Sequence, residues 1–340
     1  NAGNDMDMES SAYHNYLVEL VNEGLVDEAR VDDAVRRVLR VKFQLGIMDD
    51  PYRYADAKRE ADLLLHEDHL AASLDAARKS IVLLKNDGIL PLERKGTVAV
   101  IGPLAADKDA PIGSWRGQGE SHSAVSLLEG IRAAAGDDVE VLHAKGTDLA
   151  IGRRTFVNEL TINTTDRSGF AEAVEVAGKA DVVILALGED AWQAGEGRSQ
   201  VEIGLKGLQM ELLEAVVKAN SNVVVVLQNG RPLVLTEVEN KVAGLVEAWR
   251  LGSQAGHAIA EVLFGDYNPS GKLTASFPRF VGQAPIYYNH RNTGRPVSDQ
   301  PDFVFWSHYT DSPNTPLYPF GYGLSYTSFE YSEPVLSSDE

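Results

Sequence analysis

The stretch that decides the fold is DVVILALGE, residues 181–189, a run of aliphatic side chains that ends in Gly-Glu. VAVIGP (98–103) and NVVVVLQNG (222–230) have the same form, and GLVEAW (244–249) has it more weakly. Continuous apolar runs of strand length are typical of strands that are buried on both faces of a parallel sheet. We therefore expect these four runs to be neighbouring strands.

Segments with helical spacing of apolar residues alternate with these runs: SLLEGIRAAAG, GFAEAVEVAGKA, LQMELLEAVVKA and GHAIAEVLFG. Alternation of strands and helices predicts an α/β fold, with an open, mostly parallel sheet and helices on both faces. In such sheets the functional loops follow the carboxyl ends of the strands.

The pattern of residue types is different on either side of this region. Residues 11–46 have helical periodicity that is interrupted at Gly24, and the polar stretch that follows contains Pro51 and predicts a linker. After residue 265 Gly, Pro, Tyr and Asn dominate. We expect this long loop-rich segment to wrap around the sheet and to pack its aromatic rings on it.

Composition excludes several classes of protein. The 340 residues include no cysteine, which excludes a disulfide framework, a thiolate nucleophile and a cysteine-ligated metal. The formal charge of −19 argues against a nucleic-acid partner and an anionic membrane surface. No dinucleotide fingerprint or phosphate-binding loop is present, and the histidines are dispersed, so we expect neither a cofactor nor a metal.

The loops after the predicted strands carry aromatic and charged side chains. Trp115 and Arg116 follow the first strand, and Trp192 and Arg198 follow the second. Because neighbouring parallel strands end at the same edge, we expect these loops to converge there. The C–H face of a sugar packs on an indole and its hydroxyls need charged partners, so this set suits a carbohydrate ligand.

Glu196 is the candidate for acid–base chemistry. It lies between Gly195 and Gly197 on a loop, and flanking glycines give a loop the freedom to present a carboxylate to a ligand. A general acid in glycoside cleavage must reach the glycosidic oxygen. The alternative is one more surface carboxylate in an acidic chain, and the local pattern alone favours that alternative. Glu189, directly after its strand, is predicted to hold the loop in shape through hydrogen bonds to loop amides.

A set of motifs in order along the chain resembles the glycoside hydrolase family 3 β-glucosidases, particularly the bacterial periplasmic type with a C-terminal fibronectin-like domain. The motifs are AGNDMDM (2–8), AVRRVLRVKFQLGIMDDPY (34–52), SIVLLKNDGILPL (80–92), VAVIGPLA (98–105), GSW (113–115), GRPL (230–233), AIAEVLFGDYNPSGKLTASFPR (258–279), VGQAPIYYNHRNTGRP (281–296) and PLYPFGYGLSYT (316–327).

The resemblance implies a division of the chain into parts of a larger protein. The parts are 1–50, the last strand and helix of a (β/α)8 barrel; 51–74, a linker; 75–290, an α/β sandwich domain; 291–327, a loop-rich aromatic wrap; and 328–340, the start of a fibronectin type III-like domain. It also implies that most of the barrel lies outside this chain, and that the chain alone is inactive and binds that barrel portion.

The same resemblance assigns roles and an activity. It places the acid/base of a retaining, exo-acting β-glucosidase at Glu196 and an aromatic wall of the sugar site at Trp115. The nucleophilic aspartate belongs to the barrel, and neither Asp5 nor Asp7 matches its motif. The expected partners are a β-glucoside or oligosaccharide and the remaining barrel, and the expected location is the periplasm or the exterior. A homodimer is left open.

Two interpretations from other classes remain. One is a non-catalytic carbohydrate-binding or scaffold protein of the same fold. The other is a nucleotide-binding α/β domain, against which the lack of a phosphate-binding loop speaks.

Overall fold

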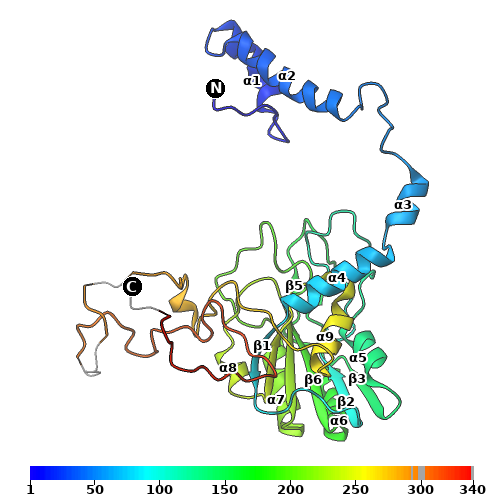
Figure 1. The fold of residues 1–340 in the computed structure, drawn as a ribbon, viewed down its shortest axis with the longest axis vertical. Coiled ribbons are helices and arrows are strands. Elements are labelled where there is room, and N and C mark those ends of the chain that lie inside the picture. The colour runs from blue at the N-terminus through cyan, green and yellow to red at the C-terminus, as the bar shows by residue number, and fades with distance from the viewer. Residues whose placement is uncertain (292–293, 298–302, 338–340) are drawn as a thin grey trace. The chain divides into compact units, whose positions relative to one another are not determined.

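The computed structural model describes residues 1–291, 294–297 and 303–337. The chain divides into two compact units, Asn1–His66 and Glu67–Glu340, which are described separately below (Figure 1).

The first unit is helical, as predicted for residues 11–46. It contains α1 (Ala12–Asn22), α2 (Glu28–Gln44) and α3 (Ala57–Leu63). The break falls at Gly24, which has a φ of 71°, and the side chain of Asp27 caps α2 by accepting from the Ala29 N–H at 3.0 Å. Helix α3 forms inside the stretch predicted as a linker, with Asp56 as its cap. Asn1–His66 has no strand in the structure, so the barrel strand stays a prediction.

A six-stranded sheet forms the centre of the second unit. Its order is β1-β8-β7-β6-β2-β3, and every pair is parallel except the antiparallel pair of β1 with β8. The strands are β1 (Val82–Asn86), β2 (Gly96–Ile101), β3 (Val139–Ala144), β6 (Val182–Gly188), β7 (Val223–Gln228) and β8 (Gly244–Glu247). The predicted open, mostly parallel sheet is confirmed, and the four apolar runs are β2, β6, β7 and β8.

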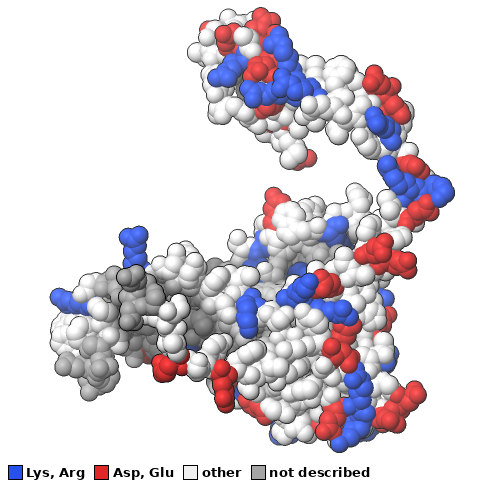
Figure 2. Space-filling model, viewed as in Figure 1, with Lys and Arg blue, Asp and Glu red and all other residues white. Residues whose placement is uncertain are grey.

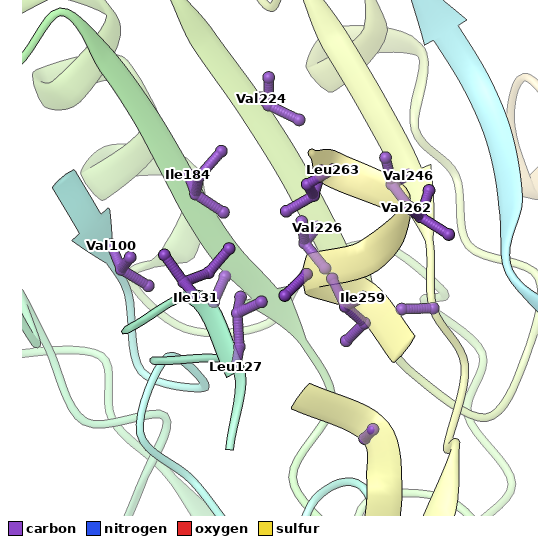
Figure 3. Close-up of a cluster of buried hydrophobic side chains, with 14 of the residues drawn as sticks. Val100, Leu127, Ile131, Ile184, Val224, Val226, Val246, Ile259, Val262 and Leu263 are labelled. Atoms are coloured by element: carbon purple, nitrogen blue, oxygen red, sulfur yellow. The ribbon is translucent and has the colours of Figure 1, made fainter. Parts of the chain in front are cut away.

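Helices cover both faces of this sheet, also as predicted. On one face lie α4 (Glu67–Ser80), α5 (Leu127–Ala135) and α9 (Ala255–Leu263), and on the other lie α6 (Phe170–Lys179), α7 (Gln209–Ala219) and the short α8 (Thr236–Glu239) (Figure 1). Two core clusters result, because successive strand side chains point to opposite faces. Figure 3 shows the first cluster, in which Val100, Ile184 and Val226 of the strands face Ile131 of α5 and Ile259 of α9.

Residues after α9 run along the β1 edge of the sheet. A short 3-10 helix, Val281–Gln283, is their one helical turn within the described residues. Phe277 and Tyr318 form an isolated bridge and are buried in the second core cluster, and Leu324 forms a bridge with Leu83 of β1. This confirms that the loop-rich segment packs aromatic rings on the sheet. Residues 328–337 have no strand, residues 338–340 lie outside the described residues, and the fibronectin-like start stays a prediction.

Three smaller elements lie outside the central sheet and its covering helices. Strands β4 (Ala150–Ile151) and β5 (Thr161–Ile162) form a two-stranded hairpin, and a 3-10 turn, Gly252–Gln254, precedes α9.

On the face of the second unit seen in Figure 2, acidic and basic side chains are interspersed. The charge of −19 is therefore not gathered into one acidic surface on this face.

Candidate functional site at the carboxyl edge of the sheet

Four loops meet at the carboxyl edge of the sheet. Residues 102–126 follow β2, 189–208 follow β6, 229–235 follow β7 and 248–251 follow β8. Because these strands are parallel and adjacent, their loops leave the sheet on one side. The strand order therefore places the loops after β2, β6 and β7 at one edge of the sheet, as the sequence predicted.

Glu196 lies in a turn whose backbone depends on its glycine neighbours. Gly195 has a φ of 129° and Gly197 a φ of 68°, values that residues with a side chain rarely adopt. The Glu196 side chain is exposed. Its carboxylate has no hydrogen-bond or ion-pair partner within the part of the chain that the structure describes, so it is free to meet a ligand.

The loop of Glu196 touches the loop of Trp115. The Ser114 hydroxyl donates to the Ala194 carbonyl at 2.7 Å, and this contact is buried. A Cβ placed on Gly195 would overlap the Ser114 hydroxyl and lie 3.4 Å from Trp115 Nε1. Only a glycine therefore lets the two loops approach this closely, one residue before Glu196.

An open hollow lies beside this contact. Its volume is about 470 Å³, and its lining includes Ser114, Trp115, Gly195, Asn229, Trp249 and Arg250. The Trp115 side chain is 69% exposed. An exposed indole next to the polar side chains of Ser114, Asn229 and Arg250 gives the hollow both kinds of surface that a sugar uses.

The other predicted binding residues form a cluster of their own. The Arg116 guanidinium pairs with Asp109 at 2.8 Å and lies 4.8 Å from the centre of the Trp192 ring. Trp192 also meets the ring of Phe156 edge-on, and Arg198 donates to the Phe156 carbonyl. The structure thus brings these three predicted residues together, engaged with one another and with the loops rather than lining the hollow.

Charge pairing in this cluster affects one carboxyl group. Burial works to raise the pKa of Asp109, but the hydrogen bond and the charge of Arg116 outweigh it and hold that pKa below its usual range. Asp109 is therefore the anionic partner that fixes Arg116 over Trp192.

Arg250, which sequence reasoning missed, ties two of the loops together. Its guanidinium is largely buried and donates to the Ala110 carbonyl at 2.7 Å and to the Asp190 carbonyl at 2.8 Å. Ala110 belongs to the loop after β2 and Asp190 to the loop after β6. Trp249 and Arg250 follow GLVE, the sequence of β8. Because functional loops follow the carboxyl ends of parallel strands, this position could have marked both residues as site candidates.

Glu189 accepts a loop amide, although not one of its own loop. Its Oε2 accepts from the Gly230 N–H at 2.9 Å, and its Oε1 lies 2.7 Å from Nε of Arg231. Its side chain is 1% exposed. The predicted structural role agrees with these contacts.

Glu247, at the end of β8, is a fully buried carboxyl group below the hollow. Its Oε1 accepts from the Trp249 N–H at 2.9 Å and its Oε2 accepts from the Asn229 amide at 3.1 Å. Burial raises the pKa of Glu247 to about 8, and the nearby charge of Glu189 adds to the increase. Glu247 is therefore neutral in the folded protein below that pH.

This raised pKa predicts a pH dependence of stability. Between the ordinary glutamate pKa of 4.5 and about 8, the folded state holds a proton on Glu247 that the unfolded state releases. The Glu247 contribution is fully present below pH 4.5 and falls by up to about 1.4 kcal/mol per pH unit as the pH rises toward 8.

We expect Glu247→Gln to flatten the fall in the thermal unfolding midpoint between about pH 5 and about pH 8. Glu172→Gln, at an exposed position of α6, is the control and should keep the wild-type slope. Equal slopes for Glu247→Gln and wild type would show that Glu247 is ionised when folded.

Comparison with known proteins identifies the family. Residues 81–326 match the family model of the glycosyl hydrolase family 3 C-terminal domain. The chain belongs to this family. The matched range begins just before β1 and ends within the last residues of the aromatic wrap, so it includes all four loops of the candidate site.

The relatives that this chain matches are longer proteins than the chain itself. It is 43% identical to a periplasmic beta-glucosidase of Salmonella typhimurium, over 99% of this chain and 46% of that protein. It is 36% identical to a beta-xylosidase of Formosa agariphila, over 99% of this chain and 46% of that protein. The chain thus spans about half the length of these relatives.

A solved structure of the same kind agrees with the fold. The crystal structure of a beta-glucosidase from Listeria innocua superposes with a TM-score of 0.84 at 36% identity, over 96% of this chain and 43% of that chain.

None of the helices within the described residues is long and apolar enough to span a membrane.

Proposed function

We propose that this chain is part of a retaining, exo-acting β-glucosidase that releases terminal β-linked glucose, with Glu196 as its acid/base. The observation that carries the proposal is the Glu196 turn: its carboxylate is exposed and has no partner among the described residues, and Gly195 beside it contacts the Trp115 loop and lines the hollow. Family membership and the 43% identity to a beta-glucosidase support the same activity.

Glu196 would act twice in a double displacement. It first protonates the glycosidic oxygen as the bond to the anomeric carbon breaks, and it then takes a proton from the water that attacks the glycosyl-enzyme. The nucleophile would be an aspartate on the barrel portion of the protein. Retention requires the two carboxyl groups to lie about 5–5.5 Å apart, so the barrel aspartate would have to reach the rim of this hollow.

The hollow would hold the sugar through its aromatic and polar lining. Trp115 offers an exposed indole for the C–H surface of the ring, and Trp249, whose ring also packs on Phe277, adds a second aromatic side chain to the lining. We predicted that Arg116, Trp192 and Arg198 bind substrate. Because they contact one another and the loops, they would shape the loops that surround the hollow. Glucose is proposed over xylose because the beta-glucosidase relative is more similar than the beta-xylosidase relative, at 43% against 36% identity.

The proposed partners and location follow from the same relatives. The barrel portion would complete the site, and the protein would act in the periplasm or outside the cell, as the name of the Salmonella relative suggests. The reaction needs no cofactor, because two carboxyl groups supply its proton transfers and its nucleophile.

The stereochemistry of the product tests this function. The natural protein that contains this chain should release glucose from cellobiose and from aryl β-glucosides, and NMR should detect the β-anomer first. Residues 1–340 alone, as the control, should show no turnover. First release of the α-anomer would exclude the retaining mechanism, and binding of glucosides without any turnover would favour the non-catalytic scaffold.

A further inference from the structure

Arg231 is a half-buried arginine that reaches from one loop of the site to another. It stands in the loop after β7, and its side chain is 18% exposed. Its Nη2 donates to the carbonyl of Gln193 at 2.8 Å and to the carbonyl of Arg198 at 3.0 Å. Both acceptors belong to the loop after β6, and Glu196 lies between them in the sequence.

One nitrogen atom therefore holds both sides of the Glu196 turn. Gln193 precedes Glu196 by three residues and Arg198 follows it by two. Two carbonyls that accept from the same Nη2 must lie close together, so these bonds close the base of the turn. The Gln200 side chain adds a bond to the same Gln193 carbonyl at 3.1 Å.

The guanidinium is itself held in place. Its Nε pairs with the buried Glu189 carboxylate at 2.7 Å, and the other Glu189 oxygen accepts from the Gly230 N–H. The Arg231 carbonyl accepts from the Asn229 amide at 2.8 Å. A planar guanidinium can place one nitrogen beside a carboxylate as an ion pair while another nitrogen donates to two carbonyls, whereas a lysine has a single nitrogen.

From these contacts we infer that Arg231 is a positioning residue for the acid/base step: it fixes the turn that presents Glu196 and so sets where that carboxyl group meets the leaving oxygen. This inference rests on the proposed role of Glu196. Since Arg231 would act through the turn, its loss should impair proton donation more than sugar binding.

The dependence on the leaving group is the measurement that separates this role from a general structural one. The ratio kcat/KM reports the steps up to the first bond cleavage. The leaving group of cellobiose is a sugar alkoxide that needs protonation, whereas dinitrophenyl β-glucoside releases dinitrophenolate, which leaves as an anion without it. A misplaced acid lowers kcat/KM for the first substrate and leaves it nearly unchanged for the second.

Simple truncation of Arg231 would leave the buried Glu189 charge without its partner, which destabilises the fold. The double variant Arg231→Met with Glu189→Gln removes both charges, and Arg231→Lys keeps a positive charge opposite Glu189. In the natural protein we expect the double variant to lose about tenfold or more in kcat/KM on cellobiose and less than about threefold on dinitrophenyl β-glucoside. Arg231→Lys should lose less on cellobiose than the double variant.

Arg94→Met is the matched control. Arg94 also pairs with a carboxylate, that of Asp266, and donates to a backbone carbonyl, that of Ala134, but it precedes β2 at the amino edge of the sheet. It should leave both ratios unchanged. Equal losses of the Arg231 variants on the two substrates, or no loss on either, would overturn the inference.

Glu196→Gln, measured in parallel, keeps the two ideas distinguishable. If Glu196→Gln shows the leaving-group dependence and the Arg231 variants do not, Arg231 has no positioning role and the proposed function stands. If Glu196→Gln itself lacks that dependence, the acid/base assignment fails, and the positioning role fails with it.

Discussion

Replacement of Glu196 by Gln in the natural protein is expected to lower kcat/KM for cellobiose by about 10²- to 10⁴-fold, the usual contribution of a general acid. The amide keeps the size of the side chain and its exposed position, so the fold should be unaffected. What is lost is the proton that stabilises the departing sugar oxygen. The hydrolysis of cellobiose depends on that proton because an alkoxide is a poor leaving group.

Activated substrates separate the two halves of the reaction. Dinitrophenyl β-glucoside forms the glycosyl-enzyme without an acid, so its kcat/KM should change little in Glu196→Gln. Removal of that intermediate needs the base. In Glu196→Ala, added azide should attack the glycosyl-enzyme without base assistance, partly restore turnover and yield β-glucosyl azide.

Glu202 provides the control within the same loop. It is an exposed carboxylate after β6, six residues beyond Glu196, and Glu202→Gln should keep wild-type rates on both substrates. Near-normal hydrolysis of cellobiose by Glu196→Gln would refute the acid/base assignment.

The parallel strands could be predicted because their environment leaves a simple pattern. β6 and β7 lie inside the sheet with helices on both faces, so they are apolar without interruption. β3 lies at the edge, half exposed, and its sequence VEVLHA mixes Glu and His with aliphatic residues. No continuous run marks such a strand, and we did not predict it.

The site was only partly predictable from residue types. The two glycines singled out Glu196, but the local pattern alone favoured a surface carboxylate, and only the family resemblance made it the acid/base candidate; the structure shows that both glycines adopt positive φ. Trp192 and Arg116 carry the expected chemistry, yet they contact each other, because the path of the loop after β2 decides their neighbours. That path depends on the Asp109 pair and on the Arg250 bridge, contacts between residues far apart in the sequence.

Gly130→Ala is expected to destabilise the core strongly, although it adds only one methyl group. Helices α5 and α9 approach each other at this glycine, and a Cβ added there would overlap the backbone carbonyl of Gly256. Backbone cannot move aside as a flexible side chain can, so the helices must separate. Overpacking of this kind costs about 3 kcal/mol in the free energy of unfolding.

The same crossing anchors the far end of the Trp115 loop. The Val125 N–H donates to the Ser253 carbonyl at 2.9 Å, and the Gly256 N–H donates to the Val125 carbonyl at 3.0 Å. Helix α5 begins directly after, with Ser126 and Glu129 as a capping box. Separation of α5 from α9 should therefore also disturb the loop that carries Trp115, and glucoside affinity should fall together with stability.

Gly178→Ala is the matched control, because Gly178 also lies in a helix, α6, and a Cβ added there meets no atom within 4 Å. Alanine suits a helix better than glycine, so this variant should gain about 0.5–1 kcal/mol. Chemical unfolding of the two variants beside wild type measures the contrast. A Gly130→Ala protein as stable as Gly178→Ala would mean that α5 and α9 do not meet at these glycines.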